Sequence, residues 1–114
     1  MTAIEAARWK GFADRFSEEH DGWSASLLVR QIDGGVETAI DDRPFRGVTF
    51  ENRNGHQTLI LTFGDDADEH LAHIVEQPSD LAVLDADEGR CSLIIGLADG
   101  SGCVLELASP FNPD

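Results

Sequence analysis

Apolar side chains recur at helical spacing near the start of the chain. Four of them fall at positions i, i+3, i+4 and i+7: Trp9, Phe12, Ala13 and Phe16. This spacing places them on one stripe of an α-helix, and the residues between them include charged ones. The pattern therefore predicts an amphipathic helix over about residues 3–21, with its apolar stripe packed on the rest of the protein.

Both ends of this helix carry local signals. Thr2 and Glu5 have the spacing of a capping box, in which the hydroxyl and the carboxylate each bond to a free backbone N–H. Asp21-Gly22 follows the last apolar position, and glycine accepts the left-handed conformation common after helices. We expect the helix to begin at the capping box and to end at Gly22.

The chain then changes to a period of two. Apolar residues alternate with polar ones from Trp23 to Val29, and a second alternating segment spans residues 36–42. The turn residues Asp33-Gly34-Gly35 separate the two, which predicts a hairpin. We expect Arg43-Pro44-Phe45 to interrupt the second strand, because proline lacks the N–H donor that a central strand requires.

A second hairpin is predicted around Asn54-Gly55, the preferred pair for a two-residue type I′ turn. Closing the chain at this turn places Phe50 opposite Leu59 and Val48 opposite Leu61. All four side chains then lie on one face, so turn chemistry and hydrophobic pattern indicate the same register.

Residues 65–77 fit two structures. Ala67, Leu71, Ile74 and Val75 fit a helical stripe, whereas Pro78 and the surrounding strands favour a strand from about residue 69 to residue 76. The residues themselves leave both structures open.

Three more apolar segments follow, at residues 81–84, 93–98 and 103–107. With a three-residue turn at Gly100-Ser101-Gly102, we expect Leu97 to face Leu105 and Ile95 to face Leu107. The whole pattern predicts an α+β, mainly β fold. An N-terminal helix packs on an antiparallel, partly open barrel or sandwich of about seven strands. We expect one domain over residues 1–114, with the helix at about 3–21, the β domain at about 23–109 and a short C-terminal tail.

The amino-acid composition narrows the range of possible binding partners. Twenty-two acidic residues against eight basic ones give a formal charge of −14, which repels phosphate backbones and anionic membranes. No apolar run is long enough for a membrane span, and no signal pattern opens the chain, so we expect a cytoplasmic protein. Cys91 and Cys103 are expected to be free thiols, because the predicted register holds them too far apart for a disulfide.

Several short motifs together resemble a family of small bacterial proteins of unknown function, domain of unknown function five thousand three hundred and thirty-five. The similar segments are Trp9-x-x-Phe12, Phe16-Ser17-x-x-His20-x-Gly22-Trp23, Arg46-Gly47-Val48, His70-Leu71-Ala72-His73 with Pro78, and Ala98-Asp99-Gly100. In that family the segment after the first histidine tends to be β-branched. The resemblance therefore implies a strand for residues 70–76, and it implies no activity.

The only candidate set for metal or acid–base chemistry is His20, His70 and His73. A zinc-like ion needs three or four converging ligands, and a strand would turn His70 and His73 to opposite faces. We therefore assign no catalytic, cofactor-binding or metal-binding residue and no cofactor. The sequence favours a non-catalytic binding or protein-interaction domain. Its partner is either a second copy of the chain, in a homodimer paired through an exposed strand edge, or an unknown protein. The alternative is a metal-assisted hydrolase or small-ligand enzyme that uses these histidines.

Overall fold

The computed structural model describes residues 2–64, 71–86 and 89–109. This part of the chain forms one α-helix, α1 (Trp9–His20), which follows a short 3₁₀ turn. It also forms eight strands: β1 (Thr2–Ala3), β2 (Ser24–Arg30), β3 (Val36–Arg53), β4 (His56–Phe63), β5 (Leu71–Glu76), β6 (Asp80–Ala86), β7 (Arg90–Gly96) and β8 (Gly102–Ala108). Within the described ranges, no helix is long and apolar enough to cross a membrane.

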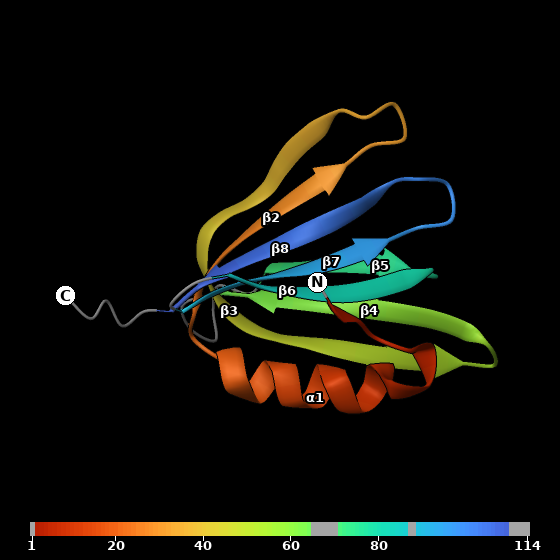
Figure 1. The fold of residues 1–114 in the computed structure, drawn as a ribbon, viewed down its shortest axis with the longest axis horizontal. Helices are drawn as coiled ribbons and strands as arrows, with labels where there is room; N and C mark the ends of the chain where they lie inside the picture. Colours follow the sequence, from red (N-terminus) through yellow and green to blue (C-terminus); the bar gives the residue numbers. More distant parts are fainter. Residues whose placement is uncertain (1, 65–70, 87–88, 110–114) are drawn as a thin grey trace.

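The strands form a single antiparallel sheet in the order β1-β6-β7-β8-β2-β3-β4-β5. The sheet is strongly curved, and α1 runs along one side of it (Figure 1). Because β1 and β5 are the two ends of the strand order, the sheet stays open between them. The predicted fold class, mainly β with an N-terminal helix on an antiparallel open sheet, is confirmed.

Helix α1 buries the predicted stripe, but it begins later than predicted. Trp9, Ala13 and Phe16 are buried against the inner face of the sheet. The capping box is wrong: Thr2 lies in β1, opposite Val83 of β6, and the helix starts only at Trp9 without a side-chain cap. Pairing with the otherwise uncovered edge of β6 satisfies the backbone of the first residues better than a helical turn with no core beneath it.

The Asn54-Gly55 hairpin has the predicted register. Phe50 lies opposite Leu59, and Val48 lies opposite Leu61. Asn54 and Gly55 both have positive φ, 54° and 89°, as the type I′ turn requires. This hairpin supplies the centre of the core, where Leu59 and Leu61 are fully buried.

The predicted interruption at Pro44 does not occur, because β3 runs unbroken through it. The Phe45 N–H donates to the Trp23 carbonyl at 2.7 Å, so the backbone of Pro44 faces the other side, towards β4. The Gly64 N–H still donates to the Pro44 carbonyl at 3.0 Å, and the Gly64 carbonyl accepts from Nε of Arg46 at 2.7 Å, so the missing donor of Pro44 leaves this acceptor satisfied. β3 pairs with β2 before this point and with β4 after it.

The predicted register of the last hairpin is also wrong. Leu105 lies opposite Leu93 rather than Leu97, and Leu107 lies opposite Cys91. The turn is longer than predicted, because the Leu97 N–H bonds to the Ser101 carbonyl at 2.9 Å and closes a loop between them. Cys103 lies opposite Ile95, and the two cysteines are free as predicted.

Candidate functional site

His20 is a packed residue in the last turn of α1. Its Nδ1 lies 2.8 Å from the Phe16 carbonyl oxygen, which can only accept a hydrogen bond, so Nδ1 carries the proton. The ring also contacts the rings of Phe16 and Trp23, with centroid distances of 4.2 and 4.5 Å. These contacts orient the remaining nitrogen, Nε2, towards Cys91 at 3.4 Å.

The Sγ of Cys91 is thus within hydrogen-bond distance of the histidine ring. Burial, and secondarily the charge of Asp85, raises the pKa of Cys91 to about 11. At neutral pH the group is a thiol rather than the thiolate that acts as nucleophile or metal ligand. The His20–Cys91 pair has the residue types of a nucleophilic dyad, but its protonation state suits a structural contact.

The other two candidate histidines lie elsewhere. His70 is outside the described residues. His73 is on β5 opposite Leu61, and its half-buried position lowers its pKa by desolvation. Over the described residues, no group of three or more His, Cys, Asp or Glu side chains could hold a metal ion. The structure therefore does not bring His20 and His73 into a common site.

His73 lines a groove of about 370 Å³ between β5 and the ends of β2 and β8 that face it. The lining comes from the end of β2 and its turn, from β5, and from the β7–β8 turn with the start of β8: Val29, Arg30, Gln31, Ile32, His73, Ile74, Val75, Glu76, Leu97, Ser101, Gly102 and Cys103. Two of these are exposed large apolar residues, Ile32 at 71% and Ile74 at 59%. The groove is therefore mainly apolar and runs beside β5.

β5 is an edge strand, and within the described chain it pairs only with β4. The Gln77 N–H donates to the Gln57 carbonyl at 2.7 Å, which fixes the alternation of backbone groups along β5. In an antiparallel pair every second residue points its N–H and C=O at the partner strand. The backbone N–H and C=O groups of His73 and Val75 face β4. The backbone groups of Ala72, Ile74 and Glu76 therefore face away from the sheet.

The side chains of β5 alternate as well. His73 and Val75 lie opposite Leu61 and Leu59 and face the interior, whereas Ile74 lies opposite Ile60 on the outer face. Glu76 is exposed on that outer face, with its Oε1 3.4 Å from Nε2 of His56. A strand added beside β5 would thus find backbone partners, an apolar inner side and a carboxylate on its outer side.

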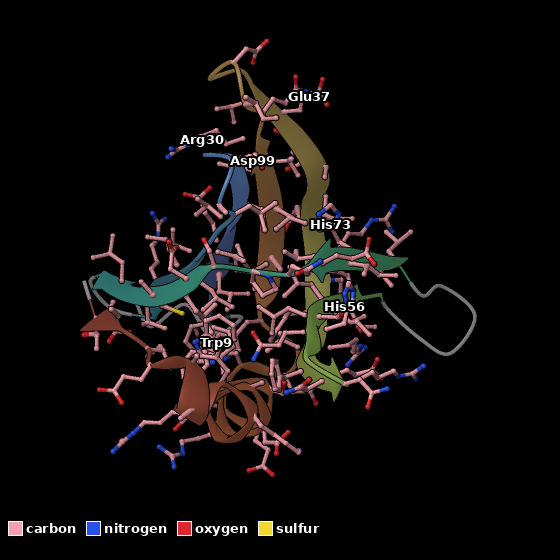
Figure 2. All side chains as sticks on the ribbon, turned by 90° about the vertical axis from the view of Figure 1, so that its right-hand side faces the viewer. Trp9, Arg30, Glu37, His56, His73 and Asp99 are labelled. Carbon is pink, nitrogen blue, oxygen red and sulfur yellow. The ribbon has the colours of Figure 1, made fainter. Side chains whose placement is uncertain are left out.

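Charged groups lie around the end of the groove away from α1. Figure 2 shows Arg30, Asp99 and Glu37 at this end, with Trp9 between helix and sheet on the other. The hydroxyl and the backbone N–H of Ser101 hold the pKa of Asp99 below its usual range, so this exposed group stays a carboxylate. Arg30 follows Val29, whose side chain packs on the core, and therefore projects from the opposite face of β2.

The sequence singled out His73 only as a candidate for metal or acid–base chemistry, and it did not predict the groove around this residue. The groove joins residues from three distant segments, and no local motif links Val29, His73 and Leu97. One signal was available: Ile74 lies at an outward position of a strand that ends at Glu76, shortly before Pro78. Proline near the end of a short strand indicates an edge strand, and an outward isoleucine on that strand indicates a contact with another molecule.

The comparisons with known proteins give a family and no activity. The chain matches a family model over residues 1–114, described as a family of unknown function, DUF5335. No curated protein and no solved structure shows significant similarity to it.

Proposed function

The chain belongs to the DUF5335 family, whose function is unknown, and on that premise we propose that it is a non-catalytic protein-interaction domain. Its binding surface is the free edge of β5 together with the apolar groove beside it. A partner polypeptide adds to β5 as one more antiparallel strand and inserts alternate side chains into the groove. This is the mode of recognition in which main-chain hydrogen bonds supply affinity and side-chain pockets supply specificity.

The observation that carries the proposal is the combination of edge and groove. Ala72, Ile74 and Glu76 direct their backbone groups away from β4, and all three residues are exposed. An added strand would lie about 4.8 Å from β5, and its inward side chains would meet Val29, Leu97 and Cys103. Soluble proteins usually cover such edges or protect them with charges and bulges, so an apolar open edge indicates a binding surface.

Site-specific photo-crosslinking in the cells that express the protein tests this proposal. A photoreactive amino acid at position 72 should form an adduct of defined mass with a polypeptide. The matched control carries it at position 84, because Leu84 is also an exposed apolar residue, 42% exposed, on β6. Adding Ile74→Pro, which removes an edge donor, should reduce the adduct at position 72.

Absence of an adduct at position 72, or equal adducts at positions 72 and 84, would contradict the proposal. Mass spectrometry of the adduct identifies the partner as a second copy of this chain or as another protein.

A further inference from the structure

This inference rests on the proposed function and concerns the chemistry of the partner. We infer that the strand added to β5 comes from a different, basic polypeptide, in which apolar residues alternate with lysine or arginine. The alternative partner is a second copy of this chain, which would pair β5 with β5. The geometry of the edge accepts either strand, so the charges decide between them.

The alternation follows from the two sides of the added strand. Successive side chains of a strand point to opposite faces, so every second one enters the groove, whose lining includes Val29, Ile32 and Leu97. Those positions must be apolar. The others lie on the outer face beside the side chain of Glu76, where a lysine or arginine forms an opposite-charge pair across the strands.

The net charge separates a basic partner from a second copy. The chain carries −14, so two copies repel each other before contact, whereas a basic segment is attracted from solution. Locally, the carboxylates of Glu76 and Asp99 lie at the groove, and Asp99 bonds to the lining residue Ser101. Arg30 is the one lining residue with a fixed positive charge among those described, and its side chain projects from the other face of β2.

Salt dependence is the clearest distinction between the two partners. The Debye length shortens from about 14 Å at 50 mM salt to about 6 Å at 300 mM. Binding of a basic segment therefore weakens with salt, whereas pairing of two acidic copies strengthens with it.

The experiment uses the full chain and three decapeptides with blocked ends. In the first peptide lysine alternates with valine, and in the second glutamate alternates with valine. The third has the sequence of the first, with the backbone nitrogen of every lysine methylated. Isothermal titration calorimetry at 50 and 300 mM salt measures binding, and light scattering under the same conditions measures the mass of the protein alone.

We expect the lysine–valine peptide to bind at 50 mM salt and to bind at least severalfold more weakly at 300 mM. The glutamate–valine peptide should not bind. The lysines of the added strand lie opposite Ala72, Ile74 and Glu76, so their N–H groups are the ones that face β5. The N-methylated peptide has the same charge but lacks these donors, so it should bind at least fivefold more weakly than the lysine–valine peptide. Ile74→Pro should weaken binding of the lysine–valine peptide by a similar factor, whereas Leu84→Ser should leave it unchanged.

Any other outcome would contradict the inference that the partner strand is basic. Equal binding of the lysine–valine peptide and its N-methylated form would mean charge attraction without strand addition. Binding of the glutamate–valine peptide, or of none of the three, would remove the assigned partner chemistry. A dimer that grows with salt and is lost in Ile74→Pro would make a second copy the partner. If the peptide results contradict the basic partner, or if the partner is a second copy, a crosslink at position 72 would still support the proposed function. A failure of this inference can therefore be distinguished from a failure of the proposed function.

Discussion

Two strand edges of the same sheet differ in whether another element covers their backbone groups. In the second half of β3, Val48 directs its N–H and C=O away from β4, as Ile74 does in β5. The edge of β3 is covered: the Val48 N–H donates to Oγ of Ser17 at 2.8 Å, and the Val48 carbonyl lies 3.0 Å from the same oxygen. Helix α1 thus replaces a neighbouring strand at β3, whereas no described element does so at β5.

The covered edge also depends on Gly47. A Cβ at this position would lie 3.2 Å from Oγ of Ser17, and the backbone there has a φ of +153°. A small residue lets the helix approach closely enough for its serine to reach the strand. The chain therefore seals the edge of β3 with Ser17 and Gly47, and among the described residues no such pair covers the edge of β5. This contrast suggests that the open edge of β5 serves binding.

The largest loss of stability is expected when the main contact between helix α1 and the sheet is removed. Trp9 is 2% exposed, packs edge-on against Phe50 and donates from Nε1 to the Ile4 carbonyl at 2.9 Å. Trp9→Ala should lower the free energy of unfolding by about 3–5 kcal/mol, measured from the urea midpoint. The matched change at the open edge, Ile74→Ala, should cost about 0.5 kcal/mol or less. Equal losses would mean that β5 is covered too.

The sequence predicted the covered side of the molecule better than the open side. The stripe of Trp9 and Phe16 and the Asn54-Gly55 turn are local patterns whose physical meaning does not depend on distant residues. The start of the helix could not be predicted, because Thr2 forms a strand only if β6 offers an unpaired edge. The groove could not be predicted for a similar reason: it exists only once the sheet curves and brings the β7–β8 turn near β5.

A smaller effect is expected at the serine that seals β3. Ser17→Ala leaves the N–H and carbonyl of Val48 without their partner in a partly buried position. The free energy of unfolding should fall by about 1–3 kcal/mol, and the Val48 amide should exchange with deuterium faster. Ser79→Ala is the control, because that hydroxyl makes an exposed bond to the Gly96 carbonyl. A loss no greater than in the control would refute the sealing role.

The open side should respond to pH through His73. Burial lowers its pKa below the ordinary value of 6.5, so below pH 6.5 the unfolded chain binds more protons than the native state. The contribution of neutral His73 is complete above pH 6.5 and is lost as the pH falls towards its lowered pKa. Between pH 7.5 and 5.5, the melting temperature of His73→Leu should fall less than that of the wild type. Ile74→Ala, which removes no titratable group, should follow the wild type; if His73→Leu also does so, the assignment is wrong.

The smallest effect is expected from proline at an outward position of the open edge. The Ala72 N–H faces away from β4, so Ala72→Pro removes no ladder bond and should change the free energy of unfolding by less than about 1 kcal/mol. One residue further, the His73 N–H faces β4, and His73→Pro should cost about 3 kcal/mol because a ladder bond is lost. Urea denaturation of both variants, with His73→Leu to correct for the lost imidazole, measures the difference. Similar losses at the two positions would mean that the Ala72 N–H already has a partner, and the open edge of β5 would then be closed like that of β3.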